Sequence, residues 1–251
     1  MDQTSILQEM IQNNEACRIT QNEDVQIVNI RPQVVFNKLK DKLMDDDLQF
    51  IKGFSKKMIS HSLLVNNLQN LCTDANCTNK ESRFRAIPNG NINSKIMFAN
   101  KAPSLYESYL SMSYIGEIGL LLSVILSKLN IDRQDVYCTD IIKCHTESLD
   151  SPSCAECTNR YFAQEIRIVK PKLIVFNGLS AIDMCLKLGI LNSLPDKLAY
   201  GNIYKVTIDS LETNIMAMYD LNKVLQKTGE DYIACKNQLW NQLNTAINFI
   251  N

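Results

Sequence analysis

The sequence has little of what would make it fibrous, broadly basic or low in complexity. It contains 8 glycines and 6 prolines in 251 residues, too few for a collagen-like or low-complexity chain. Its 26 basic and 27 acidic residues leave a net charge of −1, which excludes a broadly basic nucleic-acid coat but not a local basic patch. The apolar fraction of 45% is ordinary, so the length and composition indicate one α/β domain with an appendage.

The sequence also lacks a long apolar run. The best candidate, Ile115 to Leu129, is interrupted by Glu117, Ser123, Ser127 and Lys128, so we expect no membrane span. The first ten residues, MDQTSILQEM, have no basic region, so we expect no secretory signal. These features predict a cytoplasmic protein, in which nine cysteines favour metal or cluster binding over disulfides.

The pattern of polar and apolar residues divides the chain into two parts. Residues 1–65 read as a polar, helical N-terminal extension, with helical spacing at 6–11 and 34–43 and one candidate strand at 25–30. Residues 66–251 alternate short apolar runs with amphipathic segments. The predicted strands are 95–99, 136–142, 172–176, 203–207 and 214–219, and the predicted helices are 116–129, 156–169, 178–188 and 231–249.

This alternation predicts an α/β domain with a mostly parallel sheet and helices on both faces. Ligands of such sheets bind beyond the carboxyl ends of the strands. We therefore expect the site in the segments that follow Ala99, Thr139, Phe176 and Tyr219.

Five cysteines fall in predicted loops or at a helix start. Cys72 and Cys77 form a C-x4-C pair, Cys144 follows a strand, and Cys154 and Cys157 form a C-x2-C pair. Four thiolates converging from separate loops suit an iron–sulfur cluster and zinc alike. Spacing alone does not separate these two, and unliganded structural cysteines remain a third reading.

The order of motifs after residue 71 resembles the iron–sulfur (family 4) uracil-DNA glycosylases. The cysteine pair is followed by KIMFANKAPSLYE, SYIGEIGLLL, YCTDIIKC, ECTNRYFAQEI and VKPKLIVFNGLSA, with DIIKC and KPKLIVFNG the most specific segments. The matching stretch runs from about Leu71 to Ser180, and a weaker match continues to the C-terminus. The resemblance implies a three-layer α/β/α domain over 66–251 with a mostly parallel four-stranded sheet.

The resemblance also implies a cofactor and a partner. The cofactor would be a structural [4Fe–4S] cluster on Cys72, Cys77, Cys144 and Cys157, with Cys154 as a rival fourth ligand and zinc as the alternative metal. The partner would be single- or double-stranded DNA carrying uracil or a damaged base. Such enzymes flip the nucleotide into a pocket and hydrolyse its N-glycosidic bond during base excision repair.

When the family's loop motif is aligned with this chain, one catalytic position carries a different type of residue. Lys101 stands where the family has a glutamate, and Ala102, Pro103 and Ser104 complete the substrate-binding loop. Tyr114 falls on the phenylalanine that stacks on the base. A lysine cannot act as a carboxylate, so the catalytic carboxylate must come from elsewhere.

Three further positions complete the implied site. Asp140 falls on the asparagine that reads uracil, and an ionised carboxylate there would suit an exocyclic amine such as that of cytosine. Asp220 stands where the family has a histidine, although it could equally cap a helix that begins at Leu221. Asn177 lies on a third crevice loop. A rearranged site would take its carboxylate from Glu107 or Asp220.

Two functions follow from these substitutions. The first is a divergent uracil-DNA glycosylase-type enzyme with Lys101 as its cation. The second is a catalytically inactive glycosylase-fold protein that binds DNA, or binds a protein partner through residues 1–65. Phosphate contacts are expected from crevice residues, among them Lys143, Lys223 and Lys227. A zinc-stabilised α/β protein without a nucleic-acid role is a third reading.

Overall fold

The computed structural model describes residues 17–22, 25–30, 56–70, 85–146, 149, 152–194, 197–208 and 211–251. The backbone divides into two compact units, Met1–Leu63 and Leu64–Asn251. In the first unit, strands β1 (Cys17–Asn22) and β2 (Val25–Ile30) pair antiparallel. The bounds of β2 are those of the predicted strand, whereas the helical spacing at 6–11 and 34–43 lies outside the described residues. Helix α4 (Lys56–Asn70) crosses the division between the units.

The second unit contains a six-stranded sheet in the order β3-β5-β4-β6-β8-β7. Four strands, β5, β4, β6 and β8, run parallel to one another, while β3 and β7 pair antiparallel at the two edges. The strands are β3 (Asn89–Gly90), β4 (Ile96–Asn100), β5 (Tyr137–Asp140), β6 (Leu173–Asn177), β7 (Ile203–Ile208) and β8 (Leu211–Met218). The parallel four-stranded sheet is therefore confirmed as the centre of a larger mixed sheet.

Side-chain alternation along the buried strands supplies two separate cores. In β4, Ile96 and Phe98 belong to one hydrophobic cluster, while Met97 and Ala99 belong to the other. All five residues of β4 are buried, as expected for a strand covered on both faces. Strands with two apolar faces require a helical layer on each side.

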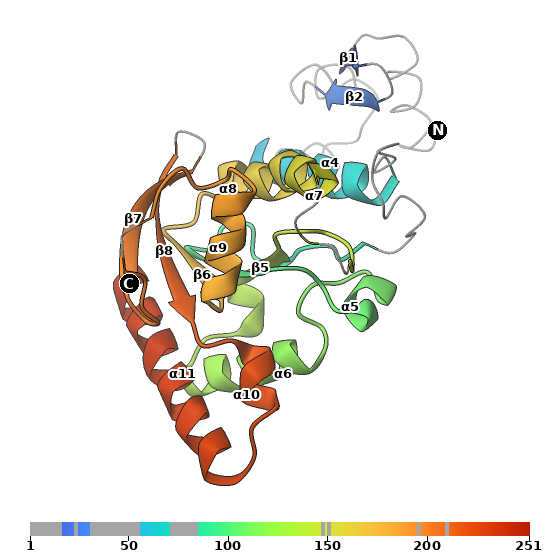
Figure 1. The fold of residues 1–251 in the computed structure, drawn as a ribbon. Coiled ribbons are helices and arrows are strands. Elements are labelled where there is room, and N and C mark those ends of the chain that lie inside the picture. Colours follow the sequence, from blue (N-terminus) through green and yellow to red (C-terminus); the bar gives the residue numbers. More distant parts are fainter. Residues whose placement is uncertain are drawn as a thin grey trace, which may run out of the picture. The chain divides into compact units, whose positions relative to one another are not determined.

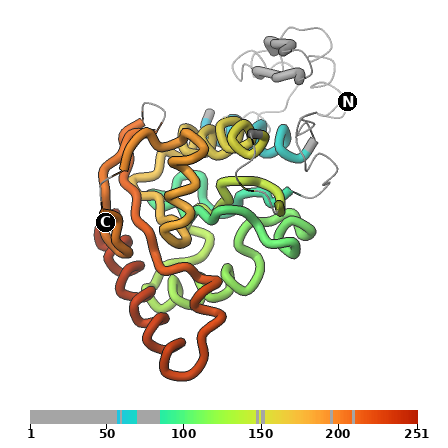
Figure 2. The backbone as a smooth tube through the Cα atoms, in the orientation of Figure 1, coloured from blue at the N-terminus to red at the C-terminus, as the bar shows by residue number. Residues whose placement is uncertain are grey.

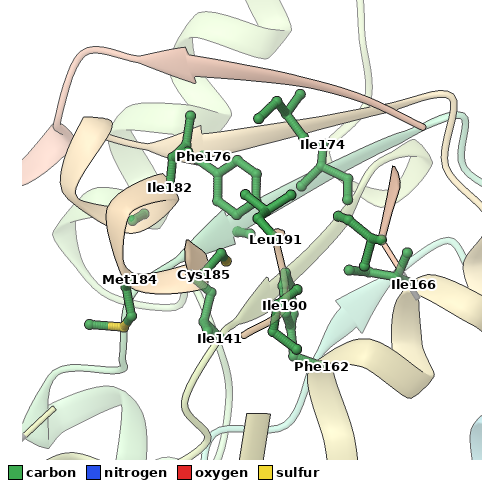
Figure 3. Packing of buried hydrophobic residues seen from close by; sticks show 14 of the residues in the cluster. Ile141, Phe162, Ile166, Ile174, Phe176, Ile182, Met184, Cys185, Ile190 and Leu191 are labelled. Carbon is green, nitrogen blue, oxygen red and sulfur yellow. The ribbon is translucent and has the colours of Figure 1, made fainter. Parts of the chain in front are cut away.

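The two helical layers are present (Figure 1). One cluster packs against helices α6 (Glu117–Lys128), α10 (Leu221–Leu225) and α11 (Gly229–Ile250). The other packs against α7 (Pro152–Cys157), the π-helix η2 (Thr158–Phe162), α8 (Ala163–Val169) and α9 (Leu179–Lys187). Figure 3 shows the second cluster, in which side chains of β6, η2, α8 and α9 converge. The predicted three-layer α/β/α architecture is confirmed.

The predicted helix over 156–169 differs from the observed one at its centre. Helices α7, η2 and α8 follow one another without a break, and the middle turn is wider than an α-helix. The Thr158 hydroxyl donates a hydrogen bond to the Cys154 carbonyl at 2.7 Å within this segment. Such π-turns cluster at functional sites, and this one follows Cys157 directly.

The four parallel strands end at the same edge of the sheet. Asn100, Asp140 and Asn177 are the last residues of β4, β5 and β6, and Met218 is the last residue of β8. Short connections follow each end, among them helix α5 (Leu105–Tyr109) after β4. None of the described helices is long and apolar enough to cross a membrane.

Candidate functional site

A pocket of about 670 Å³ opens beyond the carboxyl ends of β4 and β5. Its walls come from residues 100–104, 106 and 107, the start of α6, residues 145, 146 and 149 after β5, and Asn222 of α10. The segment from β4 through α5 to α6 is green in Figure 2. The pocket lies where the strand order predicts the binding crevice.

A chain of side-chain amides joins the ends of the parallel strands behind this pocket. The Leu221 backbone N–H donates to Asn177 Oδ1 at 2.8 Å, and Asn177 Nδ2 donates to Asn100 Oδ1 at 3.1 Å. Asn100 Nδ2 then donates to Asp140 Oδ1 at 3.1 Å and to the Ala102 carbonyl at 2.8 Å. This amide chain connects the ends of β6, β4 and β5 to the start of α10.

Asp140 is fully buried, and no described residue forms an ion pair with its carboxyl group. Burial, and then the charge of Glu107, raise the pKa of Asp140 to about 7. The Ser113 hydroxyl, the Lys143 ammonium and the Asn100 amide act in the opposite direction. Among the described residues, Asp140 Oδ2 has no hydrogen bond of normal geometry. Asp140 therefore holds a proton over much of the acidic to neutral range.

Glu107 provides a preoriented carboxylate in the pocket wall. Its side chain is 1% exposed, and its Oε2 accepts from the Ser104 backbone N–H at 2.9 Å and from the Ser104 hydroxyl at 2.8 Å. The Glu107 N–H donates back to Ser104 Oγ, which completes a capping box at the start of α5. Glu107 Oε1 is buried and forms no hydrogen bond with any described residue, although Glu107 contributes to the pocket lining.

Lys143 is buried in an ion pair and does not face solvent. Its Nζ lies 2.6 Å from Glu165 Oε1 and donates to Thr139 Oγ1 and to the Asp140 carbonyl, each at 2.6 Å. The ammonium also lies 5.9 Å from the centroid of the Phe162 ring. The prediction of a phosphate contact by Lys143 is therefore wrong. Its charge instead ties the segment before Cys144 to α8.

The pocket includes five of the predicted site residues. Lys101, Ala102, Pro103, Ser104 and Glu107 all line it. Lys101 is half-buried, and its carbonyl accepts from the Ile142 N–H, which holds the loop against the segment after β5. These residues bring a cation and a carboxylate to one cavity.

The other predicted residues lie behind the pocket wall. Tyr114, Asp140, Asn177 and Asp220 are buried and are not among the lining residues. Asp140 and Asn177 still reach the pocket indirectly, because both hydrogen-bond to Asn100, which lines it.

Tyr114 occupies a constrained position in the core rather than a place on the pocket wall. Its side chain is 4% exposed and packs in the cluster under α6. Its backbone is left-handed with φ 56°, and a Cβ on Gly119 would stand 1.7 Å from its carbonyl oxygen. Burial raises the pKa of Tyr114, and the nearby Cys138, Asp140 and Glu107 groups raise it further, so the hydroxyl stays neutral.

Asp220 caps a helix, as one of its two sequence interpretations predicts. Helix α10 begins at Leu221, and Asp220 Oδ1 accepts from the Asn222 N–H at 3.0 Å. Gly178, with φ 89°, packs against this side chain, since an added Cβ would stand 3.2 Å from Asp220 Cβ. One carboxylate oxygen is thus committed to the cap.

Two of the pocket residues that the sequence analysis did not assign to the site, Asn100 and His145, form hydrogen bonds there. Asn100 is the hub of the amide chain, and its position as the last residue of β4 was the available signal. His145 lines the pocket, and its Nδ1 lies 3.2 Å from the Pro103 carbonyl, which can only accept. The His145 N–H also donates to Ser108 Oγ at 2.9 Å, which fixes the segment after β5 against α5.

The described cysteines differ in their surroundings. Cys154 is 5% exposed and packs in the hydrophobic cluster under α8. Cys144 and Cys157 are half-buried and belong to neither hydrophobic cluster. Cys72 and Cys77 lie outside the described residues, and within the described ranges no three His, Cys, Asp or Glu side chains form a metal site.

Comparison with known proteins places this architecture in a family. The sequence model of the uracil DNA glycosylase superfamily matches residues 87–244. A type-4 uracil-DNA glycosylase of Archaeoglobus fulgidus is 25% identical over 154 residues, which cover 60% of this chain and 77% of that protein. Its counterpart in Pyrobaculum aerophilum is 28% identical over 156 residues, covering 60% and 79%. The one in Saccharolobus solfataricus is 26% identical over 181 residues, covering 67% and 82%.

Removal of the buried ammonium should strongly destabilise the fold. Lys143→Met leaves Glu165 buried without its partner, and we expect the free energy of unfolding to fall by about 3–5 kcal/mol. Urea unfolding measures this change. The double variant Lys143→Met/Glu165→Leu should recover part of the loss. As a control, Lys205→Met breaks an ion pair whose side chains are 67% and 70% exposed, and it should cost no more than about 1 kcal/mol. If Lys143→Met and Lys205→Met lowered the free energy of unfolding equally, the stabilising role of the buried ion pair would be contradicted.

The raised pKa of Asp140 gives stability a definite pH dependence. The unfolded chain loses this proton near 3.8 and the folded chain near 7, so the native state binds more protons between these values. The free energy of unfolding should therefore fall as pH rises through that window. Asp140→Asn should flatten the fall in urea unfolding measured from about pH 4 to about pH 8. The exposed Asp183→Asn is the matched control, and an unchanged slope in Asp140→Asn would refute the assignment.

Proposed function

Because this chain belongs to the uracil-DNA glycosylase superfamily, we propose that it is a DNA glycosylase acting in base excision repair. Its substrate would be a flipped uracil, or another damaged base, whose N-glycosidic bond it hydrolyses. The single observation that carries the proposal is the pocket at the strand ends, with a buried carboxylate in its wall. The names of the relatives support the reaction type.

Glu107 is the residue to which we assign the catalytic carboxylate. Cleavage of a glycosidic bond builds positive charge on the sugar, which a fixed carboxylate stabilises, or which a carboxylate-oriented water attacks. Ser104 holds Glu107 Oε2 from two donors and leaves Oε1 without a hydrogen bond among the described residues. This geometry allows Glu107 to replace the glutamate that Lys101 displaces.

Lys101 supplies the opposite charge in the same pocket. The departing base carries negative charge as the bond breaks, and a cation near it lowers the barrier. Lys101 lines the pocket and is half-buried, so its ammonium can approach a bound nucleotide from the loop. Asp220 is less suited to this chemistry, because its carboxylate caps α10.

The described cysteines that lie outside the hydrophobic clusters fit a structural iron–sulfur cluster. Cys144 and Cys157 are thiols outside the hydrophobic clusters, and thiolates are the ligands that a [4Fe–4S] cluster requires. Cys154 is packed among apolar side chains, which favours Cys157 as the ligand from α7. With Cys72 and Cys77, they would hold a cluster that fixes the segments beside the pocket. Zinc on the same four thiolates is the alternative.

A second function, DNA binding without cleavage, is favoured by the burial of residues that were expected to contact the base. Tyr114 and Asp140 are buried and are not among the lining residues, although the resemblance assigns them to base stacking and base reading. A glycosylase fold with this arrangement could bind DNA without cleaving it. The protein partner predicted for residues 1–65 stays a prediction, as does the cytoplasmic location.

Replacement of the pocket carboxylate should abolish glycosylase activity. Glu107→Gln keeps an oxygen for both Ser104 donors but removes the charge, so we expect at least about a 100-fold slower formation of abasic sites. The measurement is strand cleavage at abasic sites in uracil-containing DNA, resolved on a denaturing gel. The exposed Glu212→Gln, on β8, should match the wild type.

Two outcomes of this experiment contradict the proposal. If Glu107→Gln is as active as the wild type while its thermal unfolding is unchanged, Glu107 is not the carboxylate. If the wild type binds the DNA but forms no abasic sites at high enzyme concentration, the inactive binding function holds instead.

The fourth cluster ligand can be tested by iron content. We expect Cys157→Ser to lose most of its iron and its absorbance near about 400 nm, because one thiolate ligand is removed. Cys154→Ser should retain both, since Cys154 packs in the hydrophobic cluster. The reverse pattern would assign Cys154 as the ligand, and zinc without iron in the wild type would exclude the cluster.

A further inference from the structure

An exposed apolar surface adjoins the pocket. Six large apolar side chains lie between residues 105 and 115 and are 41–69% exposed. We call this surface the α5 platform, and its members are Leu105, Tyr106, Tyr109, Leu110, Met112 and Ile115. Exposed apolar residues that are scattered singly are ordinary, whereas six within eleven consecutive residues are a concentration typical of an interaction site.

The backbone under the α5 platform is firmly held. The Ser104 capping box fixes the start of α5, and the Met112 N–H donates to the Glu107 carbonyl at 3.0 Å. Beyond the helix, the Ser113 N–H donates to the Ile87 carbonyl at 3.0 Å. The side chains are thus presented on a fixed scaffold, which limits the entropy lost when a ligand binds.

The platform is continuous with the pocket through Tyr106. This side chain is 60% exposed, and it also lines the pocket. A Cβ added to Gly116, another pocket residue, would stand 3.8 Å from Tyr106 Cδ1, so the ring lies beside the start of α6 at the mouth of the cavity. Tyr109 follows one helical turn later, on the same side of α5.

The segment that carries the platform contains few charged side chains. Glu107 is the only ionisable carboxylate between residues 102 and 116, and it is buried in the capping box. Lys101 lies at the pocket end of the segment, and Glu117 is the first exposed carboxylate beyond it. Phosphates along residues 102–116 would therefore meet only the buried Glu107, while Glu117 lines the pocket together with Lys101.

We propose that the α5 platform stacks the unpaired bases that flank the nucleotide in the pocket. Flat aromatic rings beside a base pocket are the surfaces on which unpaired bases stack, without preference for sequence. The inference rests on the proposed function for the identity of the ligand as DNA. It narrows the substrate to single-stranded or locally unpaired DNA, with Tyr106 against the nearest base and Tyr109 against the next.

The test uses a uracil-free single-stranded oligonucleotide with 2-aminopurine, whose fluorescence falls when it stacks on an aromatic ring. Tyr106→Ala and Tyr109→Ala should each weaken binding, measured by anisotropy, by about 5- to 150-fold, and should lose the quenching. Tyr106→Phe keeps the ring and should bind like the wild type. Phe249→Ala removes an exposed ring on α11 and is the matched control. Thermal unfolding confirms that each variant is folded.

Three results would overturn the platform. Unchanged binding by both alanine variants removes the stacking role, and equal losses in Tyr106→Phe and Tyr106→Ala assign the effect to the hydroxyl. A change in self-association by sedimentation, without a change in DNA binding, makes the surface a protein interface. The proposed function fails separately, because stacking without abasic-site formation by the wild type preserves the platform and excludes the glycosylase.

Discussion

The amide chain at the strand ends is the interaction on which the site depends. Asn177 and Asn100 carry hydrogen bonds from the start of α10 across β6 and β4 to Asp140 of β5. Each amide is buried, so loss of one partner would leave unsatisfied polar groups in a water-free environment. The chain fixes the relative positions of three strand ends, and it therefore fixes the pocket wall that they support.

Buried ionisable groups near the strand ends are stabilised in two different ways. Lys143 and Glu165 form a pair that is neutral overall and holds the segment after β5 against α8. Among the described residues no cation forms an ion pair with the Asp140 carboxyl group, and burial raises its pKa to about 7, while Glu107 Oε2 is held in the capping box. Two neighbouring carboxyl groups therefore differ in their hydrogen-bond partners. Their roles follow from these surroundings more than from residue type.

The sequence predicted the layers and the edge of the sheet that carries the pocket, because apolar periodicity and strand order determine both. It predicted the part of the lining that residues 101–104 and Glu107 provide, but it also assigned to the site side chains that are not among the lining residues. Asp140 and Asn177 lie at strand ends as expected. Neither lines the pocket, and each is hydrogen-bonded to Asn100, which does. A lysine is usually exposed, and Lys143 is buried here because its ammonium forms an ion pair with Glu165, which lies 22 positions later in the chain. Such pairings are long-range, and local patterns do not encode them.

The π-turn after Cys157 has a consequence for the register of the helix. Each residue of an α-helix advances its side chain by about 100°, so one extra residue in a wide turn offsets everything beyond it by that angle. The helix is continuous, but its side chains are offset about the helix axis between α7 and α8. The cysteines of α7 therefore do not continue the α-helical spacing of the core-facing residues of α8. Deletion of a single residue from η2 would bring the two phases into line, and it would rotate Cys154 and Cys157 together away from their present directions.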